Sequence, residues 1–414
     1  MPDHGSGRTC SLRWVVAALC LLMLTSCNGA TEQTSPDPMS SGTAGDNPTT
    51  VESTASRPTA GLSSTDSPNT ESADPSSSGG QKNMDAQQEQ VATFDPAKFP
   101  LENFDKLFQG DPGEIEHRLT RLLPRAESQS DPSIHVQILS QLALAQAMQQ
   151  RFREAHDTLD RATALVHEED FLGRSRVLLE RGRVFHQAGE EEKAIPLFQE
   201  AYDIARRGKH EYHAINAAHM IAIVVANPED RNRWNRQAIA MSENAAEPQA
   251  KQWLSALYNN LGQGQIKTRD FEAALRSFER CQTLAEERGE DIVIRGAVWG
   301  RARAMRGLGR NEEALDIQNA LRLEYQQIAE RNEMPQVLLN VGLGLVYEEL
   351  AELLLTIPQS RDTSDAVTSS HAAPRSAADF ASKALEKLES DAWFRRLEPE
   401  RLERLREIQA AKRE

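Results

Sequence analysis

Residues Leu257 to Gln282 read LYNNLGQGQIKTRDFEAALRSFERCQ, and this stretch decides the fold of the chain. It contains Gly262-Gln263-Gly264, followed closely by Lys267. Glycines and a lysine can bind phosphate, but dinucleotide and P-loop motifs also need a preceding strand and a full glycine spacing. Helix-forming residues stand on both sides of these glycines. We therefore interpret Gly262 as a residue that lets two helices pack closely.

The pattern of this stretch recurs with a period of about 40 residues. Each copy has an anchor in a helical run, a small residue twelve positions earlier, a mostly large residue four positions later and a core-type residue seven positions later. Offsets of zero, four and seven lie on one helix face. The anchors are Ala155, Ala194, Trp234, Ala274 and Ala314, and the small residues are Ala143, Gly182, Ala222, Gly262 and Ala302.

This spacing resembles the tetratricopeptide repeat, most closely in the quoted stretch and in LLERGRVFHQAGEEEKAIPLFQEAYDIA. The resemblance covers residues 136–330 as five repeats and implies an all-α, right-handed superhelical solenoid of helix–turn–helix units. Two positions depart from the family pattern. Trp234 replaces the anchor alanine and Gln318 replaces a large apolar residue, so the third and fifth repeats are expected to pack less regularly.

The flanks of the array are degenerate, as the ends of solenoids usually are. Residues 93–135 are predicted to form an N-terminal helical cap, and Pro100 interrupts any long first helix there. Residues 331–390 are predicted to form a sixth repeat, with Gly342 in register and a polar insertion at about 358–375. Residues 391–414 are predicted to form a capping helix.

The N-terminus reads as an export signal. Arg8 and Arg13 precede an apolar run, WVVAALCLLML, which is too short to span a bilayer comfortably but suits a signal peptide. The run ends in Leu24-Thr25-Ser26-Cys27, which resembles the lipobox of bacterial lipoproteins. The resemblance implies a signal peptide over residues 1–26 and lipid on Cys27. Since Asn28 follows, it also implies, for a Gram-negative host, an exported protein anchored to the outer membrane and facing the periplasm. Ordinary secretion with a coincidental cysteine is the alternative.

Residues 27–92 are rich in Ser, Thr, Pro, Gly and Asp and have almost no aliphatic residues. Such a segment cannot bury enough apolar surface to offset its chain entropy. We expect a disordered tether between the lipid and the folded part. The net charge of the whole chain, −15, argues against a general nucleic-acid binder.

Catalytic and metal-binding signatures are weak. The KHEYH segment, with His210 and His213, has no third ligand at metal-binding spacing. Cys281 falls on the buried helix face, where an inert core thiol is expected. No serine stands in a nucleophile elbow. We therefore expect no enzymatic activity, no cofactor and no metal.

A binding surface remains, because in repeats of this kind the first helices line a concave groove. Residues on the free face of those helices can be chosen by their spacing from the small packing residue. The predicted groove residues are Arg176, Arg183, His186, His219, Asn259, Gln263, Lys267, Trp299, Arg303 and Arg306. Cations and amides dominate this set, so the groove is predicted to accept an acidic or polar peptide. The alternative is that its cations pair with carboxylates of neighbouring helices, such as Glu180.

These observations predict a lipid-anchored scaffold of the bacterial cell envelope that binds other envelope proteins. Two alternatives stay open. An enzymatic or glycan-binding site could lie in the degenerate ends, or the chain could self-associate through its apolar sixth first helix and its terminal helix.

Overall fold

The structure is a computed structural model that describes residues 94–108, 111–357, 376–391, 394–395 and 398–411. Across these ranges the chain forms fourteen α-helices and two 3₁₀ helices, with no strand. The all-α repeat fold expected from the sequence is therefore confirmed. The signal peptide, Cys27, the tether and the polar insertion at 358–375 lie outside the described residues.

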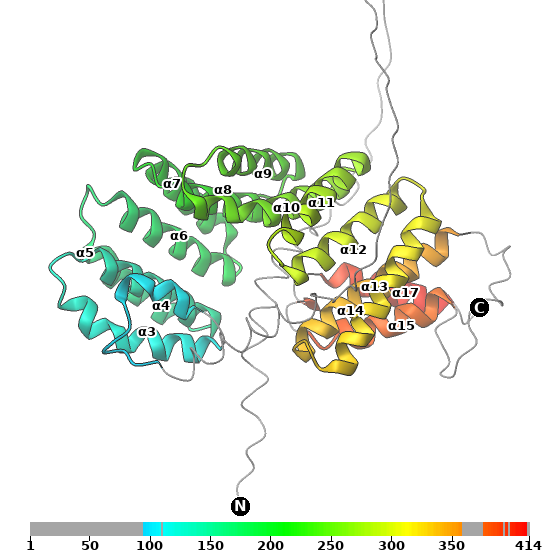
Figure 1. Cartoon of the computed structure of the whole chain (residues 1–414), viewed down its shortest axis with the longest axis horizontal. Helices are drawn as coiled ribbons and strands as arrows, with labels where there is room; N and C mark the ends of the chain where they lie inside the picture. Colours follow the sequence, from blue (N-terminus) through cyan, green and yellow to red (C-terminus); the bar gives the residue numbers. More distant parts are fainter. Residues whose placement is uncertain (1–93, 109–110, 358–375, 392–393, 396–397, 412–414) are drawn as a thin grey trace, which may run out of the picture. The chain divides into compact units, whose positions relative to one another are not determined.

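The helices alternate between a first and a second member of each repeat. Figure 1 shows them following one another in chain order from cyan to red. The first helices are α4 (Ser133–Met148), α6 (Phe171–Gln187), α8 (Glu211–Val224), α10 (Leu254–Lys267), α12 (Asp291–Gly307) and α14 (Gln336–Thr356). The second helices are α5 (Phe152–Leu165), α7 (Glu191–Arg207), α9 (Pro228–Glu243), α11 (Phe271–Glu286), α13 (Asn311–Arg331) and α15 (Ala377–Leu388). The chain ends of the array carry η1 (Leu101–Leu107), α3 (Pro112–Glu127) and α17 (Pro399–Ala410), and η2 (Pro248–Trp253) precedes α10.

Each helix packs on its neighbours in the chain, and α4 with α6, α6 with α8, α10 with α12, and α12 with α14 also contact each other as first helices of successive repeats. The small residues make the helix pairs tight. A Cβ added to Gly262 would stand 2.8 Å from ring atoms of Phe278, and one added to Gly182 would stand 2.5 Å from the ring of Phe198. Gly262 is thus a packing residue, because α11 lies directly against it.

The two departures from the repeat pattern are accommodated differently. Trp234 is partly buried and packs edge-on against Tyr202, with ring centroids 5.3 Å apart. Gln318 is 0% exposed and donates a hydrogen bond from Nε2 to the main-chain oxygen of Trp299 at 3.3 Å. The nitrogen of this buried amide thus has a partner, whereas its oxygen Oε1 is buried without a hydrogen bond.

The sixth repeat is built from α14 and α15. These two helices pack together, and residues 358–375, which the structure does not describe, lie between them in the sequence. Gly342 of α14 lies against Tyr325 of α13, where an added Cβ would stand 2.5 Å from the ring. Helix α17 packs on α15 and buries Leu402 and Leu405. These residues belong to a C-terminal core cluster that also contains α13 and α14 side chains.

Within the described ranges, every helix is too short or too polar to cross a bilayer.

Candidate functional site: a polar row on the first helices

The predicted groove residues all lie on first helices, and most of them join one repeat to the next. Arg176, Arg183 and His186 are on α6, His219 is on α8, and Asn259, Gln263 and Lys267 are on α10, with Trp299, Arg303 and Arg306 on α12. Their partners fall mainly on the first helix of an adjacent repeat.

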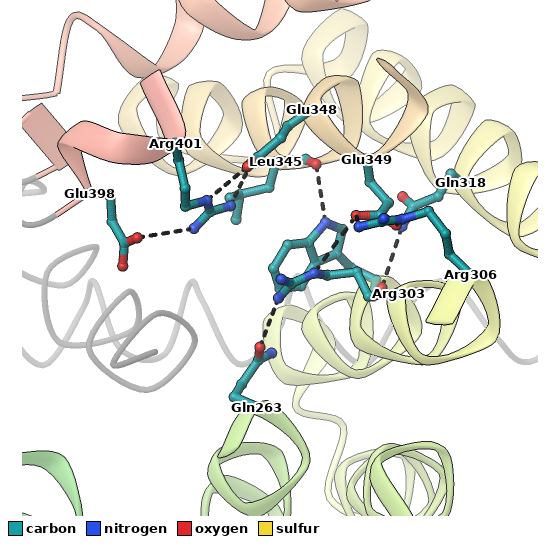
Figure 2. Close-up of polar contacts among 10 residues, drawn as sticks. Gln263, Arg303, Arg306, Gln318, Leu345, Glu348, Glu349, Glu398 and Arg401 are labelled. Atoms are coloured by element: carbon teal, nitrogen blue, oxygen red, sulfur yellow. Dashed lines mark hydrogen bonds and ion pairs between the residues drawn. The ribbon is translucent and has the colours of Figure 1, made fainter. Parts of the chain in front are cut away.

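At the junction of α12 and α14, two arginines share one carboxylate. Arg306 donates from Nε to Oε1 of Glu349 at 2.5 Å, and Arg303 Nε lies 3.7 Å from Oε2 of the same residue. The Glu349 carboxylate is 3% exposed, so this is a charge that burial would penalise without its two partners. Figure 2 shows both guanidinium groups converging on it.

Arg303 also links α12 to α10. Its Nη1 donates to Oε1 of Gln263 at 3.0 Å, and its guanidinium lies 4.6 Å from the ring centroid of Trp299. The indole N–H of Trp299 donates in turn to the main-chain oxygen of Leu345 on α14 at 3.1 Å. Trp299 is 3% exposed, so the sequence-based placement of its ring on a free helix face is not what the structure shows.

The junction of α8 and α10 is uncharged. The amide nitrogen of Asn260 and Nε2 of His219 are 2.9 Å apart. Burial, and to a smaller extent Arg183, lower the pKa of His219 to about 3, so the ring is neutral near pH 7 and Nε2 accepts the bond. Trp253 of η2 packs beside His219, with ring centroids 5.0 Å apart.

The junctions of α6 with its neighbours again use arginine. Arg183 donates to Glu180 at 2.9 Å and to Asn216 of α8 at 2.7 Å. Arg176 donates to Gln137 of α4 at 3.3 Å. The remaining predicted residue of α6, His186, has Nδ1 3.4 Å from a carboxylate oxygen of Glu191 on α7.

These contacts form what we call the polar row: one side-chain pair at each junction between successive first helices. The paired residues are 33 to 43 positions apart, close to one repeat. The pairs are Gln137–Arg176, Arg183–Asn216, His219–Asn260, Gln263–Arg303 and Arg306–Glu349.

The row is less basic than the sequence suggested. Glu180 and Glu349 pair with its arginines, as in the alternative that cations pair with nearby carboxylates. Glu349 of α14 was absent from the predicted set, which ended with Arg306 on α12. Asn260 was also missed, because the spacing rule selected its neighbour Asn259.

The middle of the row keeps hydrogen-bonding capacity. Within the described part of the chain, Nδ1 of His219, Oδ1 of Asn260 and Nε2 of Gln263 are buried and have no hydrogen-bond partner. Buried polar atoms are nearly always paired, so these three, like Nε of Arg176 at the N-terminal end of the row, can take a further partner. They offer both donors and an acceptor, and a polypeptide main chain offers the complementary groups. Asn259 is buried and Lys267, the last residue of α10, is partly exposed.

Two other titratable residues have strongly shifted pKa values. Burial raises the pKa of the Cys281 thiol to about 12, which makes it a poor nucleophile. Burial, with Arg176 next in size, lowers the pKa of His213 to about 3. Across the described ranges no three His, Cys, Asp or Glu side chains are grouped so that they could hold a metal ion.

Comparisons with known proteins agree with the repeat fold. Residues 135–207 and 255–288 match the family described as Tetratricopeptide repeat. No curated protein is significantly similar in sequence. A signal-transduction ATPase of the STAND class with a tetratricopeptide repeat sensor, from Pyrococcus horikoshii, is similar in structure, with a TM-score of 0.51 and 15% identity. That similarity covers 69% of this chain and 42% of the ATPase.

Two further solved structures are more distant. A tetratricopeptide repeat protein from Parabacteroides merdae has a TM-score of 0.40 and 15% identity, covering 78% of this chain and 99% of that protein. A kinesin light chain-like repeat protein of Podosopora anserina has a TM-score of 0.39 and 17% identity, covering 47% of this chain and 96% of that one. The two family matches show that the chain contains tetratricopeptide repeats, and the structural similarities concern the fold alone.

Proposed function

We propose that this chain is a lipid-anchored scaffold of the bacterial cell envelope and that it binds a partner polypeptide along the polar row. Tetratricopeptide repeats suggest a role in protein–protein interaction rather than catalysis. The lipid anchor on Cys27 and the envelope location are supported by the N-terminal sequence alone. The proposed function therefore has an anchoring half and a binding half.

The observation that carries the binding half is the unpaired middle of the row. The atoms without partners, on His219, Asn260 and Gln263, lie on adjacent first helices, as a single extended segment would need. Binding through main-chain groups fits a row whose arginines already have acidic or amide partners. We propose that the partner is a polar polypeptide recognised mainly through its main chain, and only secondarily through negative charge.

The structure also decides how to test this. Reversing the charge of Arg183 or Arg303 would place a carboxylate beside Glu180 or Glu349 and would weaken the fold itself. Replacing Asn260 and Gln263 by alanine removes two of the three unpaired atoms without adding a charge. It also removes the hydrogen bonds to His219 and Arg303, so circular dichroism of the variant must match that of the wild type. Gln327→Ala, on the exposed side of α13, is the matched control.

The experiment is chemical crosslinking in intact cells followed by purification of the tagged full chain. We expect partner proteins with the wild type and with the Gln327→Ala control, and strong loss with the Asn260→Ala/Gln263→Ala pair. Equal recovery from all three would refute the binding half. Separately, Cys27→Ser should move the protein from the membrane to the soluble fraction, and a Cys27→Ser protein that stays in the membrane would refute the anchoring half.

A further inference from the structure

The N-terminal end of the polar row is occupied by a segment that is not part of any repeat. Helix η1, residues Leu101–Leu107, packs against α3 and the first helix α4. It buries three apolar side chains, Leu101, Phe104 and Leu107, each at most 7% exposed. The segment is short and 3₁₀ in type, a form with poorer internal hydrogen bonding than the α-helix.

Phe104 and Asp105 of η1 hold the outermost arginine of the row. Arg176 donates from Nη2 to Oδ1 of Asp105 at 2.6 Å, and its guanidinium lies 5.2 Å from the ring centroid of Phe104. Gln141 of α4 donates to the same Asp105 oxygen at 3.0 Å. One aromatic ring and one carboxylate from adjacent residues thus meet a first-helix arginine together.

This contact differs from the rest of the row in its origin. Asp105 and Arg176 are 71 residues apart, whereas the pairs of the row are separated by 33 to 43. The repeats satisfy Arg183 with Glu180 and satisfy Arg303 and Arg306 with Glu349. Arg176 instead receives its carboxylate from outside the array, in the manner of a bound peptide.

We propose that η1 is a built-in ligand of the first-helix face and that a partner segment carrying an aromatic residue followed by an acidic residue replaces it. The inference rests on the proposed function, since it assumes that a partner polypeptide binds along the polar row. The inference adds which side chains of the partner, an aromatic ring and a carboxylate, bind at the N-terminal end of the polar row. An aromatic ring and a carboxylate satisfy the two faces of a guanidinium, the flat π surface and the N–H edge.

The exchange is physically reasonable because the bond is accessible on one side. The Asp105 side chain is 57% exposed, while that of Arg176 is 7% exposed. The Arg176 guanidinium is therefore fixed within the protein surface, whereas the Asp105 carboxylate is open to solvent. A competing carboxylate can approach beside Asp105 and take over the Arg176 N–H groups as η1 leaves.

The test uses the full-length protein in detergent and a fluorescein-labelled peptide of residues 98–108, KFPLENFDKLF. In wild type the site is filled by η1, so peptide binding is expected to be weak. In the Phe104→Ala/Asp105→Asn variant, loss of the internal competitor should tighten peptide binding about tenfold or more. A peptide with lysine in place of the aspartate should fail to bind, and adding Arg176→Gln to the vacated variant should abolish binding of the original peptide.

A vacated variant that keeps the wild-type circular dichroism and does not bind the peptide would overturn the proposal. If that variant does not fold, hydrogen exchange of the wild type decides. Amides of Leu101–Leu107 that exchange much faster than those of α4 support an exchangeable ligand, and amides that exchange only with global unfolding overturn it. If η1 is not an exchangeable ligand, the wild type should still capture partner proteins in cells. If the proposed function is wrong, no partner proteins should be captured.

Discussion

Replacing Gly182 by alanine tests whether the small residues of the repeat are there for close helix contact. The added methyl carbon would stand 2.5 Å from Cε1 and 2.7 Å from Cδ1 of Phe198. Carbon atoms pack best at about 3.5–4.0 Å. Helices α6 and α7 would therefore have to separate by about 1 Å, or the Phe198 ring would have to leave its preferred rotamer.

The magnitude follows from two opposing effects. Overpacking of a close-packed core costs about 1–3 kcal/mol. Replacing glycine by alanine inside a helix stabilises the helix by about 1 kcal/mol, which opposes the overpacking cost. We expect Gly182→Ala to lower the free energy of unfolding by up to about 2 kcal/mol, although the same change on an exposed helix surface would raise it.

The assay is urea unfolding followed by circular dichroism, carried out as a double-mutant cycle with Phe198→Leu. The smaller leucine removes the ring atoms nearest the methyl group, so Gly182→Ala should become neutral or stabilising in that background. The two changes should thus be coupled by more than about 1 kcal/mol. Stabilisation by Gly182→Ala alone, or independent effects of the two substitutions, would refute the packing argument.

Three further predictions concern buried polar and titratable groups. Glu349→Gln should lower the free energy of unfolding by about 2–4 kcal/mol in urea because it strands two arginines, while Glu352→Gln, at a more exposed ion pair, should cost under about 1 kcal/mol. Equal losses of unfolding free energy for the two variants would contradict the role of Glu349 as the buried partner of both arginines. The thiol of Cys281 should resist iodoacetamide at pH 8 in the folded protein and react in denaturant, as read by mass spectrometry of its peptide, since its pKa is raised to about 12. Labelling under native conditions would show that the helix pair opens. His213 and His219 have folded pKa values of about 3. Unfolded histidine titrates near 6.5, so the unfolded state binds more protons as the pH falls. Between pH 7.5 and 5.5 each should therefore remove about 1 kcal/mol of stability. His219→Gln should reduce that loss in urea titrations, and an unchanged pH dependence would contradict the buried, neutral assignment.

The repeat architecture could be predicted because the same residue pattern recurs several times in the sequence. Gly182 and Gly262 each precede an anchor alanine by twelve residues, and each lies under an aromatic ring of the second helix. Repetition makes such a signal strong, since one ambiguous position is corrected by the others. Gln318 shows the limit: it breaks the apolar pattern yet is fully buried, because its amide bonds to a main-chain oxygen that spacing alone does not reveal.

The candidate site could be predicted only in part. Helical spacing identifies which residues share a face, so Arg176, Arg303 and Arg306 were selected correctly as first-helix residues. Spacing does not show what faces them across a junction between helices. Glu349 comes from the next repeat, and Asp105 comes from a segment outside the array. Both carboxylates change the charge of the surface.

A second feature that the sequence pattern hid is η2. It lies in the connection between α9 and α10 and contacts α8, α9 and α10. Trp253 thereby reaches His219. A short 3₁₀ turn has no helical periodicity long enough to detect in sequence. The prediction of an N-terminal lipid anchor rests on residues before those that the structure describes and remains a prediction.

The central claim is that a partner polypeptide binds on the first-helix side of the repeats. The most direct measurement places a photo-crosslinking amino acid at Lys267, at the end of the first helix α10, or at the exposed Arg280 of the second helix α11. After irradiation of intact cells, we predict partner adducts from position 267 and none from position 280. Adducts from position 280 without any from position 267 would contradict the claim.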